Sequence, residues 1–312
     1  MGAKNKITRF RAYQLGNAGS SFSYFNGTKF TLIEARFNRL NSVNIKDEMK
    51  LCGVSKISTL HITSWDQDHC VPSQLDQIID ELKPNEIEYP GYKPHTTCGC
   101  DSLKIIEKFK RTKRAVQISP KYISSLNKSQ SYGYKDVLLH PKYLSQDSAN
   151  DNSTVKLFRS GSFNVLSLGD VESVQISSGL KTYSSIRNEI DIMILAHHGA
   201  DNGFTTSSFL KTVRPKVAIA TADYSNQFRH PKQNIRDLLH KNEIKLFTTK
   251  TGDVVIYSIG SHSGNYKVIN LMTGSTQISS TYEFSAKKMK YLSVNQDTLR
   301  ARVSKGVRGP KR

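Results

Sequence analysis

The sequence predicts an α/β protein folded as an αββα sandwich, and two observations carry this prediction. Residues 7–37 read as antiparallel strands, since apolar residues alternate there and Asn26-Gly27 is the dipeptide most typical of a two-residue hairpin. Later β-branched segments are separated by segments whose apolar residues have helical spacing. An antiparallel start followed by alternating strands and helices fits two packed sheets with helices on the outer faces.

The elements after the hairpin are expected in a regular order. Segment 41–51 predicts the first helix, and the β-branched segment 57–62 predicts a strand. Pro72 follows after a short loop and opens a stretch with helical spacing. The remaining expected elements are a helix at 101–110, short strands and loops over 120–152, strands at 164–168, 191–196 and 217–221 and from 246, helices at 207–213 and 234–241, and one or two strands over 253–275.

The chain is expected to divide into a sandwich domain at 1–278 and a basic C-terminal tail at 279–312. Beyond Glu283 the tail is rich in Lys and Arg, and Asp297 is its acidic residue. Such a composition is typical of a mobile, solvated segment.

Composition indicates the cellular location in which the protein is expected. The chain has 312 residues, of which 37% are hydrophobic, and a mean hydropathy of −0.48. It has no run of about 18 apolar residues, so no membrane span is expected. The N-terminus lacks the apolar core of a signal peptide, and the four cysteines follow no regular framework. These features predict a cytoplasmic protein in a reducing environment.

An acidic cluster follows the strand at 57–62. Asp66, Asp68 and His69 come directly after it, so they lie on a strand-to-helix loop where a rigid scaffold can aim side chains at a ligand. Carboxylates and an imidazole packed this closely repel one another unless something compensates, and a divalent cation does so. Hard oxygens with an imidazole suit zinc, manganese or iron. The alternative is a solvated Asp-rich turn that caps a helix.

Three later strands also end in His or Asp. Asp170 ends the strand at 164–168, and His197-His198-Gly199 ends the strand at 191–196. Arg229-His230-Pro231 follows the strand at 217–221. We expect Asp66, Asp68, His69 and Asp170 to converge at one edge of the sandwich.

This series resembles the metallo-β-lactamase superfamily, and in particular its ComEC-type branch, which includes domains of DNA-uptake competence proteins. That branch carries a T-H-x-D-x-D-H loop, a strand ending in L-T-G-D, a strand ending in H-H-G-S, and a later G-H-P. In this chain the corresponding motifs are Thr63-Ser64-Trp65-Asp66-Gln67-Asp68-His69, Ser167-Leu168-Gly169-Asp170, His197-His198-Gly199-Ala200 and Arg229-His230-Pro231. The match in order and spacing covers roughly residues 7–260.

The resemblance implies a set of residue roles. The metal ligands would be Asp66, Asp68, His69, Asp170 and His197, with Asp66 on a first ion and Asp68 and His69 on a second. Asp170 would bridge two ions. Asp68, His198 and His230 are the candidate catalytic residues, and the later histidines are candidates for ligand, proton donor or phosphate contact. The cofactor would be one or two divalent ions, zinc or manganese.

The chain departs from the pattern of this branch at several positions. Ser64 replaces the first His of the loop, and serine is a poor ligand for a divalent ion at neutral pH. Glu34 stands where the branch has an Asp after its early strand, and Lys232 replaces the last His of an H-P-H. These changes leave three possibilities: a one-metal enzyme, a two-metal enzyme with a weak first site, or a degenerate domain.

The net charge of +19 favours a polyanionic partner, and nucleic acid is the usual one. The candidate nucleic-acid-binding residues lie in two basic clusters. A general solubility effect, or interaction with a helix dipole at residues 110–114, is the alternative. Tyrosines between lysines over 120–152 fit either base stacking or half-buried sheet positions. The two clusters are Lys110, Arg111, Lys113 and Arg114, and Lys287, Lys288 and Lys290.

A second metal site is a weaker hypothesis. His95, Cys98 and Cys100 are close enough in sequence to share a structural zinc, but they lack the usual Cys-x-x-Cys spacing. Buried or loop thiols are the alternative.

The function expected from these features is that of a metal-dependent hydrolase, a phosphodiesterase or nuclease acting on DNA through a metal-activated water. A non-catalytic nucleic-acid-binding protein on a degenerate fold is favoured by Ser64. A small-molecule hydrolase on the same fold is disfavoured by the charge.

Overall fold

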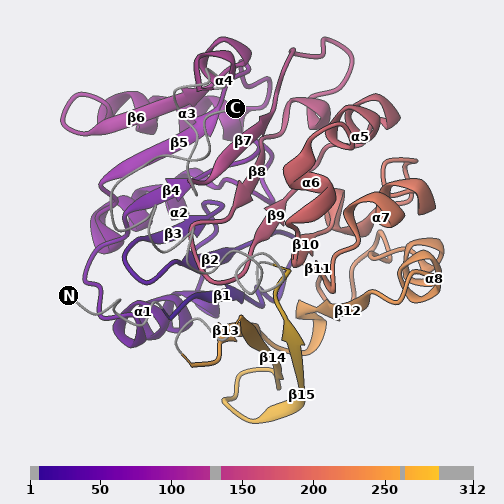
Figure 1. Ribbon diagram of the computed structural model, residues 1–312. Helices are drawn as coiled ribbons and strands as arrows, with labels where there is room; N and C mark the ends of the chain where they lie inside the picture. The colour runs from indigo at the N-terminus through magenta and orange to yellow at the C-terminus, as the bar shows by residue number, and fades with distance from the viewer. Residues whose placement is uncertain (1–6, 127–134, 261–263, 288–312) are drawn as a thin grey trace, which may run out of the picture.

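A computed structural model describes residues 7–126, 135–260 and 264–287. In this part of the chain two β-sheets pack together, with helices on both outer sides (Figure 1). Helices α1–α4 lie on one side of the molecule and α5–α8 on the other (Figure 1). The predicted αββα sandwich is confirmed.

The first sheet has nine strands in the order β15-β14-β13-β1-β2-β3-β4-β5-β6 among the described residues. Its strands pair antiparallel from β15 to β3 and parallel from β3 to β6. The bounds are β1 Arg9–Ala12, β2 Phe22–Phe25, β3 Phe30–Ile33, β4 Thr59–His61, β5 Glu86–Pro90, β6 Arg114–Ile118, β13 Val254–Ser258, β14 Asn265–Leu271 and β15 Ile278–Ser285.

The second sheet has six strands in the order β12-β11-β10-β9-β8-β7 within the same described ranges. Strands β9 to β12 are parallel, so their carboxyl ends lie at one edge. The bounds are β7 Val137–His140, β8 Val155–Phe158, β9 Val165–Ser167, β10 Ile192–Ile194, β11 Val217–Ala220 and β12 Lys245–Thr248.

The helices connect the parallel strands. Three of them begin at a Ser or Thr whose side-chain oxygen accepts from a backbone N–H one turn on: α3 at Thr96, α5 at Ser173 and α7 at Thr206. The bounds are α1 Asn41–Leu51, α2 Pro72–Gln77, η1 Ile78–Leu82, α3 Thr97–Phe109, α4 Pro120–Leu126, η3 Asn150–Asn152, α5 Val174–Leu180, α6 Ser184–Asn188, η4 Ala196–Gly199, α7 Ser207–Val213, α8 Gln233–Lys241 and η5 Thr249–Thr251.

The core has three main layers. Buried side chains of both sheets meet between them, including Phe10 and Ile33 from the first and Phe158 and Val165 from the second. Two further clusters fill the spaces under α1–α3 and under α5–α8. Each fully buried apolar side chain contributes roughly 1.5–3 kcal/mol relative to exposure. This packing fixes the two sheets relative to each other and therefore fixes the edge where their strand ends meet.

Three sequence predictions need correction in this region. Residues 120–126 form helix α4 rather than a strand or loop. Strand β5 was not among the expected elements. The expected boundary at 278/279 falls inside β15, which pairs with β14 along its length. The apolar pattern of β15 is weak because most of its residues are exposed, and this explains why the sequence suggested a tail.

The described part of the chain contains no helix that is both long and apolar enough to cross a membrane.

Candidate metal centre

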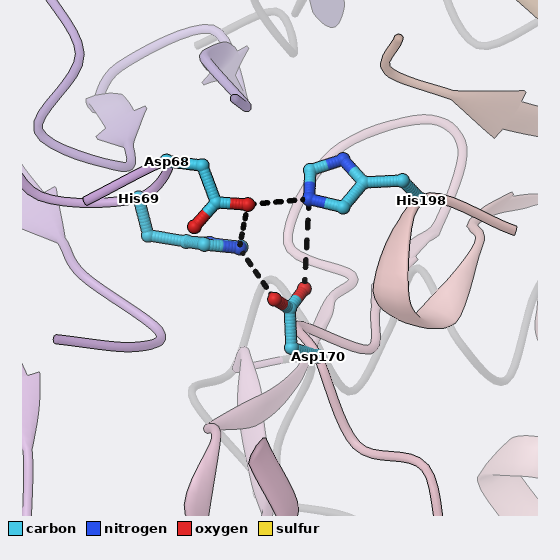
Figure 2. A group of neighbouring side chains, drawn as sticks. All are labelled: Asp68, His69, Asp170 and His198. Atoms are coloured by element: carbon cyan, nitrogen blue, oxygen red, sulfur yellow. Dashed lines mark hydrogen bonds and ion pairs between the residues drawn. The ribbon is translucent and has the colours of Figure 1, made fainter. Parts of the chain in front are cut away.

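Four side chains converge at the edge where strands of both sheets end. Asp68, His69, Asp170 and His198 each offer a ligand atom, and these atoms all lie within 4.8 Å of one another (Figure 2). Asp68 and His69 lie on the loop after β4, Asp170 on the turn after β9, and His198 on η4 after β10. Each sheet therefore supplies one carboxylate and one imidazole.

An unusual backbone turn points His198 into the group. His197 and His198 have φ angles of 46° and 54°, a left-handed conformation that costs a non-glycine residue about 1–3 kcal/mol. The turn is held by a hydrogen bond from the His197 N–H to the Gly169 carbonyl oxygen. Gly199 must remain small, since a Cβ there would lie 2.5 Å from Cβ of Pro231. Strain of this kind is a common feature of functional sites.

His69 is oriented by the first sheet. Its Nδ1 lies 3.2 Å from Glu34 Oε1, while Glu34 also accepts hydrogen bonds from the N–H and hydroxyl of Thr63. Nε2 therefore faces the group and lies 2.9 Å from Asp170 Oδ2, at ion-pair distance. A carboxylate behind one ring nitrogen, with the other nitrogen directed at further ligand atoms, is the usual arrangement of a metal-binding histidine.

His198 is oriented by the second sheet. Its Nδ1 lies 3.1 Å from the Thr221 carbonyl oxygen and 3.0 Å from the Thr221 hydroxyl, so Nε2 is directed at Asp68 Oδ2, 3.0 Å away. The Thr221 hydroxyl also bonds the Ser20 hydroxyl at 2.7 Å, and the Ser20 N–H donates to the Asp68 carbonyl oxygen. This Ser20–Thr221 bridge joins the two sheets directly behind the group.

The charges in the group are strongly coupled. Burial lowers the pKa of His69, but the carboxylates of Asp170 and Asp68 outweigh burial and place that pKa well above its usual value. Burial likewise opposes protonation of His198, and Asp68 and Asp170 again raise the pKa of its ring. Burial raises the pKa of Asp68 and Asp170, while the neighbouring histidines lower it further than burial raises it. Protons on the two imidazoles thus occupy the position that a divalent ion would take.

The donor set fits a divalent ion. Two carboxylate oxygens and two imidazole nitrogens that lie within 4.8 Å of one another suit zinc, manganese or iron.

Known proteins were compared with the chain, and two are similar to it in sequence. No protein-family profile matches the chain. The chain is similar to ComE operon protein 3 of Bacillus subtilis (strain 168), at 23% identity over 219 residues, which make up 69% of this chain and 26% of that protein. It is also similar to Competence protein ComA of Neisseria gonorrhoeae, at 29% identity over 69 residues, or 22% of this chain and 10% of that protein. The chain thus spans about a quarter or less of the length of these relatives.

A solved structure is also similar to the chain. Igni18, a metallo hydrolase from the archaeon Ignicoccus hospitalis, matches with a TM-score of 0.47 and 12% identity, over 80% of this chain and 98% of that one.

Two ligands that the resemblance of the motifs implies lie outside the group of four. The Asp66 carboxylate accepts a hydrogen bond from Ser64 Oγ at 2.9 Å instead. The His197 ring is partly exposed, and its Nδ1 lies 3.4 Å from Glu172 Oε2. His197 and His198 are consecutive left-handed residues, so their side chains point apart and only His198 enters the group. Sequence alone does not reveal this turn. His198, expected to be catalytic, occupies the ligand position.

The position of the missing loop histidine is closed by hydrogen bonds. Ser64 is fully buried, and its hydroxyl lies 3.1 Å from the Tyr92 hydroxyl. The Tyr92 hydroxyl also accepts from the backbone N–H of Trp65. These contacts tie the Ser64–Asp66 part of the loop to the segment after β5 rather than to the group of four.

His230 lies beside the group. Its ring stacks on His198 with centroids 6.3 Å apart and planes 13° apart. Burial and the neighbouring His198 and His197 lower its pKa to about 4, so the ring is neutral near pH 7. His230 therefore lies against the candidate ligand His198.

Sequence reasoning missed the supporting hydroxyls. Ser20, Thr63 and Thr221 fix the ligands, but Ser and Thr are common in turns and carried no distinctive spacing. The available signal was position, because Thr221 follows β11 as Asp170 follows β9.

The thiol hypothesis has no support in the described residues. The Cys98 thiol donates to the Cys70 carbonyl oxygen and the Cys100 thiol to the Pro94 carbonyl oxygen. Burial raises the pKa of Cys98, which disfavours the thiolate that binds zinc. These contacts favour loop thiols over a structural zinc.

The residues of the first basic cluster differ in whether their charged groups already have partners within the protein. Lys113 Nζ donates to the Pro84 carbonyl oxygen, and Arg114 Nε lies 3.2 Å from Glu86 Oε1. Lys110 lies 3.6 Å from Glu107. Arg111 instead lines a groove along α3 together with Lys93, Lys104 and Lys108.

In the second cluster, Lys287 Nζ donates to the Val213 carbonyl oxygen and its N–H donates to Asp191, so this residue anchors the chain after β15. Lys288 and Lys290 lie outside the described residues.

Proposed function

We propose that this protein is a metal-dependent hydrolase that cleaves phosphodiester bonds in DNA, with one divalent ion, zinc or manganese, held by Asp68, His69, Asp170 and His198. The observation that carries the proposal is the convergence of four ligand atoms, two from each sheet, within 4.8 Å of one another. Glu34 directs His69 Nε2 toward the Asp170 carboxylate, and the donor set matches a hydrolytic metal site.

A divalent ion bound there would supply Lewis acidity toward a phosphoryl oxygen and would bring the pKa of water near neutrality. The protein residues have distinct tasks around it. Asp170 is buried and spans both histidines, so it holds the two imidazoles at a fixed separation. Asp68 is the most exposed member, at 31% of its side chain, and therefore faces incoming substrate.

His230 is suited to proton transfer. Its ring lies against the ligand His198 without being a member of the group, so it is placed to contact water or substrate beside the ion. We assign it the role of proton acceptor or phosphate contact during hydrolysis.

DNA is favoured as substrate by charge and by the relatives. The net charge of +19 attracts polyanions, and the α3 groove places Lys93, Lys108 and Arg111 together at the surface. The groove is connected to the site loop, because Tyr92 precedes Lys93 and bonds Ser64. ComE operon protein 3 and Competence protein ComA are named for competence, a process of DNA uptake.

Elemental analysis combined with a cleavage assay tests the proposal. The purified chain should contain about one zinc or manganese ion, and it should cleave labelled DNA in a reaction that a chelator stops and the same metal restores. Asp170→Asn is the matched variant, since it keeps the shape of the side chain but removes its charge. Metal-free protein with no chelator-sensitive cleavage of single- or double-stranded DNA would contradict the proposal.

A non-catalytic nucleic-acid-binding protein is the second candidate, favoured by the closed Ser64–Tyr92 contact. Such a protein would bind DNA without cleaving it. Because the binding would be electrostatic, the logarithm of the DNA association constant should fall linearly with the logarithm of the salt concentration, by roughly 0.9 per phosphate contact on duplex and 0.7 on single strands. Truncation after Lys287, which keeps β15, should reduce that slope, whereas affinity that ignores salt would favour a small-molecule hydrolase.

A further inference from the structure

Two aromatic side chains are exposed beside the metal centre. Tyr224 and Phe228 lie on the loop after β11 and are 73% and 56% exposed. Most other large aromatic rings in the described residues are buried in the core. The loop ends in His230, next to the ligand His198. These rings therefore lie at the entrance of the candidate site.

The exposed Phe228 ring continues a stack that begins at the metal centre. Phe228 lies on His230 with centroids 5.7 Å apart and planes 25° apart. His230 lies on His198 with planes 13° apart, and Nε2 of His198 faces Asp68. Three nearly parallel rings thus lead from the candidate ligand to the surface, and the outermost ring has an open face.

The loop that presents Phe228 is held in shape by Asn226. Its side-chain amide donates to the carbonyl oxygens of Asp223 and His230, and its Oδ1 accepts from the His230 N–H. The Arg229 N–H donates to the Asn226 carbonyl oxygen, with Arg229 at a φ of 53°. A ring fixed in this way loses little conformational entropy when a ligand stacks on it.

The surroundings favour a flat ligand that carries negative charge. Arg229 is exposed next to Phe228, and Lys232 follows His230 by two residues. A nucleotide in an unpaired strand combines an aromatic face with a phosphate. In duplex DNA the faces of internal bases are already covered by their neighbours.

We propose that Phe228 is a stacking platform for an unpaired base of the strand whose phosphodiester bond reaches the Asp68–Asp170 group. This inference rests on the proposed function and assigns its substrate as single-stranded or end-frayed nucleic acid.

Binding to two oligomers of equal charge tests the platform. One is a phosphorothioate oligothymidylate, which resists cleavage, and the other is an abasic phosphorothioate oligomer of the same length. The full-length, metal-loaded chain should bind the first more tightly by about 5- to 150-fold, the effect of stacking one base. Phe228→Ala should remove this preference, and Phe228→Trp should retain it.

Leu51→Ala is the matched control, because Leu51 is 70% exposed at the end of α1, away from the stack. This variant should keep the preference. Equal binding of the two oligomers by the unaltered chain, or a preference that survives in Phe228→Ala, overturns the platform. If the unaltered chain still cleaves DNA in a metal-dependent way, only the platform has failed; binding of neither oligomer removes both proposals.

Discussion

The two halves of the loop after β4 behave differently. The Asp68–His69 half meets Asp170 and His198 from the other sheet, and its imidazole Nε2 is directed at Asp170. The Ser64–Asp66 half closes on itself, since Ser64 bonds both Asp66 and Tyr92. Both halves follow the same buried strand, β4, so their distance from the strand end does not explain why only one of them joins the group of four.

The hydrogen-bond partners of the two halves differ, and we expect this difference to decide which residues bind an ion. Glu34 supports His69 from behind, and Thr221 supports His198 in the same way, so that both Nε2 atoms face the carboxylates. In the second half the polar atoms already satisfy one another. We therefore expect one metal site, at the Asp68–His69 half, and no metal site at the Ser64–Asp66 half.

The largest expected effect separates the two halves directly. Asp68→Ala should remove the bound ion and reduce metal-dependent turnover to background, because a four-ligand site loses a charged ligand. Folding should be nearly unaffected, since the side chain is 31% exposed on a loop.

Asp66→Ala, two residues away, is the matched control and should keep its ion. Metal content and turnover are measured on both variants together with their Tm. Equal loss of metal in both would show that the two halves form one site.

A smaller effect is expected from the residues behind the ligands. Glu34→Gln should weaken metal affinity by about 10- to 100-fold, because an amide holds His69 less strongly in the tautomer that presents Nε2. Tyr92→Phe, which alters only the closed half, should leave the affinity unchanged. Competition with a chelator of known affinity measures both, and a matching loss in Tyr92→Phe would contradict the division of the loop.

Introducing the missing ligand should change stoichiometry rather than affinity. Ser64→His should raise metal content from about one ion per chain toward two, because it restores an imidazole beside Asp66. The new ring must displace the Tyr92 hydroxyl, so Ser64→His combined with Tyr92→Ala should show the larger increase. Two tightly held ions in the unaltered chain would show that the Ser64–Asp66 half also binds metal and would contradict this prediction.

The smallest expected effect is a pH dependence of stability without metal. The folded-state pKa of His69 lies above the ordinary value of about 6.5. Its contribution to stability is therefore fully present below about pH 6.5 and is lost as pH rises through the folded pKa. Tm of the chelator-treated chain should fall above neutral pH, and the metal-loaded chain should resist this because the ion replaces the protons. A metal-free chain that grows more stable as pH rises would contradict the charge balance described for the group.

Sequence patterns predicted the sandwich and the loop that carries Asp68 and His69, because strand ends and helix starts leave local signals. They did not distinguish His197 from His198, since that choice depends on two φ angles in a left-handed turn. They also placed Asp66 among the ligands, because nothing local reveals that Ser64 and Tyr92 occupy its surroundings. The tail boundary was misplaced because β15 is an exposed edge strand without an apolar stripe.

The Ser20–Thr221 bridge and the ligand set have a consequence for how the chain assembles. Neither sheet can hold an ion alone, because each brings only one carboxylate and one imidazole. Ion capture therefore requires that the sheets have already docked, and it belongs to the last stage of folding. An ion that binds only the docked state would act as a clasp between the two layers and would raise the free energy of unfolding by RT ln(1 + [L]/Kd). A pulse of metal added during refolding would then mark the moment at which the two halves of the molecule meet.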